Sequence, residues 1–154
     1  MKIGFTGTRT GMTTAQWETV GLIMAEALDI KKPNEWHDGD CVGADEQAHG
    51  IAVTLKRVAD IETHGHPCNK DEWRANKDFD VMHEVMPPLV RNRIIVDSVD
   101  LMIAAPKEYE NVVRGSGTWA TIRYSFRKKK RLYIVWPDGT KVEQRHEDGS
   151  VSLF

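Results

Sequence analysis

Two segments carry the strongest signal in this sequence: Leu101-Met102-Ile103-Ala104-Ala105-Pro106 and Arg114-Gly115-Ser116-Gly117-Thr118-Trp119. The first is a continuous apolar run that ends at a proline, which is typical of a buried strand. The second is a glycine-rich turn before a helical pattern, because Trp119, Ile122 and Phe126 recur at steps of three and four residues. A strand, a glycine-rich turn and a helix in this order favour an alternating α/β fold.

The glycine-rich turn has the features of a phosphate site. The N–H groups that open a helix point outward at the positive end of its dipole, and Gly115 and Gly117 allow a ligand to approach the backbone. Ser116 and Thr118 add hydroxyl groups. The alternative is an ordinary loop in which Ser116 or Thr118 only caps the helix.

The composition predicts one globular domain. The chain has 154 residues, of which 40% are apolar and 29% charged, with a formal net charge of −2 that argues against nucleic acid as a partner. Two cysteines do not make a disulfide framework, so a cytoplasmic protein with reduced thiols is expected. No apolar run approaches the roughly 18 residues of a membrane span, and polar residues interrupt the N-terminus where a signal peptide would be apolar.

Strand and helix patterns alternate along the rest of the chain. Residues 2–6 predict a first strand, and Thr13-Thr14-Ala15-Gln16 matches a capping box that begins a helix. The buried face of that helix is predicted at Trp17, Val20, Met24, Ala27 and Leu28. Further strands are predicted at residues 35–37, 60–64, 99–105 and 132–136, with helices after residues 44, 88 and 117.

This alternation predicts a single-domain, Rossmann-like α/β fold: a mostly parallel sheet with helices on both faces. Residues 1–136 would form a nucleotide-binding domain, and residues 137–154 an extension with a hairpin near Asp148-Gly149. Ligands of such sheets bind beyond the carboxyl ends of the strands. The loops expected to converge there, with their glycines, hydroxyls and an arginine, span residues 7–11, 38–45, 64–68 and 114–118.

Three other regions leave alternatives open. Histidine, cysteine and aspartate cluster at residues 37–49 and 64–68, but no zinc spacing is matched, so no metal is expected. Residues 69–86 predict either a flap with aromatic side chains that stack on a base or a surface excursion with one helical turn. Arg91 is expected near the buried face of the helix after Pro87-Pro88, either neutralising a phosphate or paired with Asp97 or Asp100.

Four motifs occur together: residues 4–9, Gly43-Ala44-Asp45, residues 91–97 from Arg91-Asn92-Arg93 onward, and residues 115–121. In combination they resemble the SLOG superfamily, which includes the lonely-guy phosphoribohydrolases and the DprA core, and most closely its YspA-like branch. The resemblance covers most of residues 1–136 and implies a nucleotide or nucleotide-derived ligand. The ligand-binding residues that it implies are Gly7, Thr8, Arg9, Gly43, Asp45, Arg91, Asn92, Gly115, Ser116, Gly117, Thr118 and Thr121.

One position departs from the lonely-guy pattern. Those enzymes cleave an N-glycosidic bond with a glutamate where this sequence has Thr121. The resemblance therefore implies nucleotide binding without turnover, by a sensor, carrier or sequestering protein. The alternative is a nucleoside 5′-monophosphate N-glycosidase in which Asp45 or Asp40 is the acid and Arg91 takes part in catalysis. No cofactor is expected, and the sequence leaves open whether the chain forms a homo-oligomer.

Overall fold

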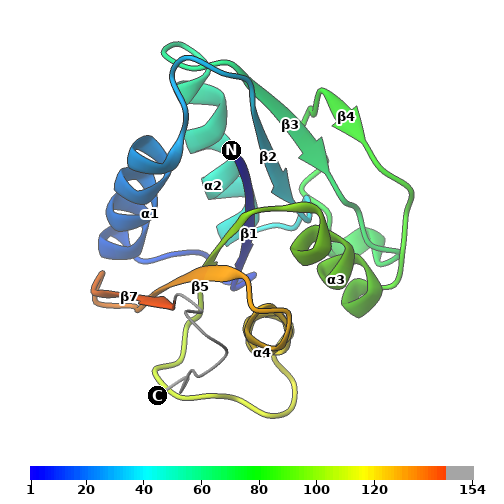
Figure 1. Cartoon of the computed structure of the whole chain (residues 1–154). Helices are drawn as coiled ribbons and strands as arrows, with labels where there is room; N and C mark the ends of the chain where they lie inside the picture. Colours follow the sequence, from blue (N-terminus) through cyan, green and yellow to red (C-terminus); the bar gives the residue numbers. More distant parts are fainter. Residues whose placement is uncertain (145–154) are drawn as a thin grey trace.

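The computed structural model describes residues 1–144, which form a seven-stranded sheet with helices on both of its faces (Figure 1). In chain order the elements are β1 (Lys2–Gly7), α1 (Thr14–Ala27), β2 (Asn34–Asp38), α2 (Ala44–Leu55), β3 (Ile61–Gly65), the 3-10 turn η1 (Asp71–Trp73), β4 (Val81–Met82), α3 (Pro88–Ser98), β5 (Leu101–Ala105), α4 (Gly117–Arg127), β6 (Arg131–Val135) and β7 (Lys141–Gln144).

The strand order is β4-β3-β2-β1-β5-β6-β7, and every neighbouring pair is parallel except β6 and β7. The predicted Rossmann-like, mostly parallel sheet is therefore confirmed. The order of the strands reverses between β1 and β5. Ligands of open α/β sheets bind at such a reversal, beyond the carboxyl ends of the two strands.

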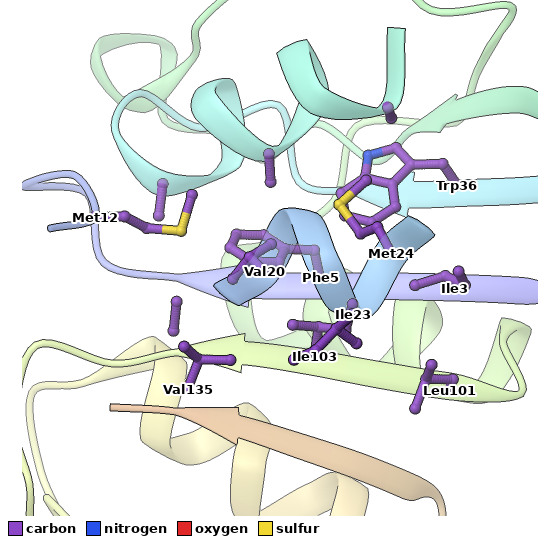
Figure 2. Packing of buried hydrophobic residues seen from close by; sticks show 14 of the residues in the cluster. Ile3, Phe5, Met12, Val20, Ile23, Met24, Trp36, Leu101, Ile103 and Val135 are labelled. Carbon is purple, nitrogen blue, oxygen red and sulfur yellow. The ribbon is translucent and has the colours of Figure 1, made fainter. Parts of the chain in front are cut away.

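Each face of the sheet has its own apolar core. Helices α1 and α2 cover one face, where Phe5 and Trp36 stack with ring centroids 5.9 Å apart beneath Val20 and Met24 (Figure 2). Helices α3 and α4 cover the other face, where Trp119 packs among apolar residues of α3, β5 and β6. Strand β5 is buried on both faces, which explains its continuous apolar run.

Helix α1 begins as predicted, with a capping box between Thr13 and Gln16. Its predicted buried face is wrong at Trp17, whose side chain is 47% exposed. Gln16 lies inside instead, where its amide donates to the carbonyl oxygens of Pro106 and Val135. A buried polar side chain is stable in the core when its hydrogen bonds are satisfied. The pattern of apolar residues alone therefore predicted the buried face of α1 incorrectly.

The segment between β3 and α3 contains the single helical turn η1 and the short strand β4. Pairing of β4 with β3 was not predicted, because a two-residue strand has no periodicity of its own. Asp40 anchors the segment: its Oδ2 accepts hydrogen bonds from Arg74, and its Oδ1 accepts one from the Lys77 N–H.

Strand β7 forms an antiparallel hairpin with β6 through a turn at Gly139, where φ is +84°. The hairpin predicted near Asp148-Gly149 lies outside the described residues. Within residues 1–144, no helix has the length and apolar character that would cross a membrane.

Candidate functional site

A cleft of about 920 Å³ opens at the reversal between β1 and β5. Its walls are the loop after β1, the loop between β2 and α2, the start of α3, and the segment from Lys107 to the first turn of α4. Most of the predicted ligand residues line this cleft: Gly7, Thr8, Arg9, Asp45, Arg91, Asn92, Gly115, Ser116, Gly117 and Thr118.

Two of the predicted ligand residues, Gly43 and Thr121, do not line the cleft. Gly43 has a φ of +87°, and a Cβ there would overlap the backbone of Arg9. This glycine therefore lets the loop after β2 pack closely against the loop after β1. Thr121 was expected to bind the ligand, but its side chain is buried and its hydroxyl donates to the carbonyl oxygen of Gly117 at 2.8 Å. Thr121 contributes instead to a neighbouring hollow of about 150 Å³.

The start of α4 offers unpaired donors to the cleft. Ser116 is the N-cap, and its Oγ accepts the Trp119 N–H at 3.1 Å. Within residues 1–144, the N–H groups of Gly117 and Thr118 have no hydrogen-bond acceptor. Gly117 is exposed, and the only neighbour of a Cβ placed on it would be Asn92 Nδ2, at 3.7 Å. Two backbone donors, a side-chain amide and the helix dipole thus favour an anion here.

Arg91 is buried beneath the cleft and is largely engaged by the protein. Its Nη1 donates to the carbonyl oxygens of Gly39 at 2.6 Å and His66 at 2.9 Å. Its Nε donates to Asn92 Oδ1 at 2.7 Å, which turns the amide nitrogen of Asn92 toward α4, and its Nη2 contacts Cys41 Sγ at 3.5 Å. A guanidinium has five N–H groups, so at most one is left for a ligand.

The predicted alternative, an ion pair of Arg91 with Asp97 or Asp100, is wrong. Asp97 accepts a hydrogen bond from the Tyr124 hydroxyl and lies 3.9 Å from Lys128 Nζ. Asp100 accepts the Lys2 N–H. Arg91 lies instead on the inner side of α3, where the loops after β2 and β3 supply its acceptors.

Asp45 is the carboxyl group at the floor of the cleft. Its Oδ2 accepts the N–H groups of Gly39 at 3.1 Å and Cys41 at 3.3 Å. Burial, and next the charge of Asp38, raises the pKa of Asp45 to about 7. A cleft carboxyl that exchanges its proton near neutral pH is suited to general acid–base chemistry. Asp40, the other predicted acid, does not line the cleft.

We expect Asp45→Asn to change how stability depends on pH. Between pH values near 3.8 and 7, the unfolded chain releases the Asp45 proton while the folded chain keeps it. The carboxyl therefore costs the parent protein no stability below this range and progressively more as pH rises through it. Urea unfolding across this range should show Asp45→Asn gaining stability relative to the parent as pH rises. Parallel pH profiles would contradict the assignment.

Trp73 of η1, one of the aromatic side chains in the segment 69–86, lies in the wall of the cleft, where the guanidinium of Arg9 stacks on its ring at 3.7 Å. Sequence reasoning did not assign Cys41 or Arg123 to the site. Cys41 also lines the cleft, but burial raises the pKa of its thiol to about 12, which excludes a thiolate nucleophile at neutral pH. Arg123 donates to the carbonyl oxygen of Val112 at 2.7 Å and so holds the segment before α4.

No family model and no curated protein matches the chain. The site is therefore interpreted from its own geometry.

Proposed function

We propose that the cleft binds a nucleotide or a nucleotide-derived ligand, with its phosphate at the start of α4. The observation that carries this proposal is the pair of unpaired N–H groups at Gly117 and Thr118, beside the Asn92 amide and at the reversal of strand order. The cleft volume of about 920 Å³ is sufficient for the sugar and base as well. The resemblance to the SLOG superfamily supports the same ligand class.

Calorimetric titration with a panel of nucleoside 5′-monophosphates and the matching nucleosides tests this proposal. A phosphate held by charge-assisted hydrogen bonds contributes about 1.5–3 kcal/mol. We therefore expect the monophosphates to bind about ten- to a hundredfold more tightly than the nucleosides. Equal affinities, or no binding by the whole panel, would contradict the phosphate assignment.

Asp45 supports a second function, hydrolysis of the N-glycosidic bond. With a pKa of about 7, the Asp45 carboxyl is protonated in about half of the molecules at neutral pH. It can donate this proton to the base as the N-glycosidic bond breaks, while water adds to the sugar carbon and returns a proton to the Asp45 carboxylate. Of the two acids predicted from the sequence, Asp40 does not line the cleft and is hydrogen-bonded to Arg74, so Asp45 is the acid that this reaction would use. Chromatography should then detect free base released from a monophosphate by the parent protein. Asp45→Asn should lose this release while keeping its circular dichroism spectrum.

If the parent protein binds the monophosphate but releases no free base, the hydrolase function is excluded and the binding function remains. In either function, the proposed phosphate contacts at the start of α4 are the same, because Asp45 lies on a different element, at the start of α2. The two measurements therefore distinguish a binding protein from an enzyme.

A further inference from the structure

Four histidines lie together outside the cleft. His37 and His64 come from β2 and β3, and His66 and His83 from the two ends of the segment that joins β3 to α3. His37 follows Trp36 in β2, so it projects from the sheet face opposite the core that α1 and α2 cover. None of the four lines the nucleotide cleft.

The four rings form a two-by-two block. His37 Nδ1 meets His66 Nε2 at 2.8 Å, and His64 Nδ1 meets His83 Nε2 at 2.8 Å. The two pairs then stack: the ring centroids of His37 and His64 are 4.3 Å apart, and those of His66 and His83 are 4.1 Å apart. Nitrogen atoms of all four rings thus face the inside of the block. One nitrogen from each of His37, His66 and His83 lies within 4.8 Å of the other two.

Two carboxylates hold the outside of the block. Glu35 Oε1 lies 2.9 Å from His37 Nε2, and Glu62 Oε1 lies 2.7 Å from His64 Nε2. A carboxylate at Nε2 accepts a hydrogen bond from the N–H group there, so the lone pair of the neutral imidazole lies on Nδ1. In metal sites, ligand histidines regularly donate their second N–H to a carboxylate in this way. The inward-facing Nδ1 of His37 is therefore oriented as a ligand, and His66 and His83 can coordinate through Nε2 once their ring proton lies on Nδ1.

We propose that this block binds a divalent transition-metal ion of the zinc class, with His37, His66 and His83 as ligands and His64 beside them. Two nitrogens that coordinate one zinc ion tetrahedrally lie about 3.3 Å apart, given zinc–nitrogen bonds of about 2.0–2.1 Å. The His37–His66 contact of 2.8 Å therefore needs to open by only about half an ångström, and the ligand nitrogen of His83 already lies within 4.8 Å of the other two. Imidazole ligands select zinc, cobalt, nickel or copper over magnesium.

The ion would fasten the segment between β3 and α3 to the sheet. Without the ion, the pairing of β4 with β3 extends over only two residue pairs. The same segment carries Trp73 to the cleft, and the carbonyl oxygen of His66 accepts a hydrogen bond from Arg91. The ligands come from separate segments of the chain, which is why no zinc spacing is present in the sequence.

Tag-free protein, stripped with a chelator, tests the site by calorimetric titration with Zn²⁺ and by the visible spectrum of Co²⁺. We expect one ion per chain, a Co²⁺ spectrum typical of four-coordination, and a Tm raised by about 5–10 °C at a hundredfold excess of Zn²⁺ over its Kd. Mg²⁺ should have no effect. Absence of Zn²⁺ and Co²⁺ binding to the parent protein would overturn the proposal.

Matched variants locate the ion. His66→Gln and His83→Gln should each abolish the stoichiometric binding and the gain in Tm, while circular dichroism shows that they remain folded. His49→Gln is the control within the fold, because His49 lies on α2 beside Asp38 and Phe79. His146→Gln is a second control, outside the described residues. Unchanged Zn²⁺ affinity in His83→Gln, or its loss in His49→Gln, would refute the assignment.

Discussion

Arg91→Ala lowers the free energy of unfolding by about 3–5 kcal/mol, because it leaves buried acceptors without a donor and opens a cavity. The orphaned acceptors are the carbonyl oxygens of Gly39 and His66, and the Asn92 amide loses the contact that orients it. In a protein of this length, the loss corresponds to a fall in Tm of roughly 10 °C. Urea and thermal unfolding measure it.

Arg93→Ala is the matched control, since Arg93 lies on the same helix but is exposed. Its effect should stay within about 0.5 kcal/mol. Arg91→Lys should recover part of the stability only, because an ammonium lacks the planar fork of the guanidinium. If Arg91→Ala is as stable as the parent but binds nucleotide ten- to a hundredfold more weakly, Arg91 serves the ligand rather than the fold.

Gly117→Val weakens binding of a nucleoside monophosphate by about ten- to a hundredfold, because the added side chain excludes the phosphate and its charge-assisted hydrogen bonds. A side chain at this position would project into the space beside Asn92 Nδ2 that the proposed phosphate occupies. Residue 117 opens α4, has few neighbours and is exposed, so the fold should persist. Calorimetric titration and circular dichroism give the two readouts.

Gly50→Val controls for the added bulk. Gly50 is an exposed helical glycine with no atom within 4 Å of a Cβ built on it. We expect this variant to bind as the parent does. Nucleoside without phosphate should bind both variants with similar affinity, which separates loss of the anion site from damage to the whole cleft. A folded Gly117→Val with unchanged monophosphate affinity would show that the phosphate lies elsewhere.

The fold could be predicted because the parallel sheet leaves a strong pattern in the sequence. A strand buried on both faces, such as β5, is a continuous apolar run, and each intervening helix has its own periodicity. The two-residue strand β4 has neither feature, since its pairing depends on β3. The inward position of Gln16 depends on two acceptors that lie 90 and 119 residues away along the chain.

The loops of the cleft could also be predicted, because the carboxyl ends of parallel strands share one edge of the sheet. The contacts that individual side chains make could not be predicted. Arg91 finds its acceptors in two loops that are distant in sequence, and Thr121 donates to the helix backbone instead of facing the cleft. The block of His37, His64, His66 and His83 could not be predicted either, because its rings come together only through the pairing of β2, β3 and β4.

The close approach of Gly43 to Arg9 has a consequence for how this cleft can acquire a new specificity. The loops after β1 and β2 also share the hydrogen bond from the Ala44 N–H to the Thr8 carbonyl oxygen, so a change in one loop displaces the other. Residues 107–113 are held largely through the side chain of Arg123. In a directed-evolution library, the two joined loops should accept only paired changes, whereas residues 107–113 should tolerate insertions and new sequences.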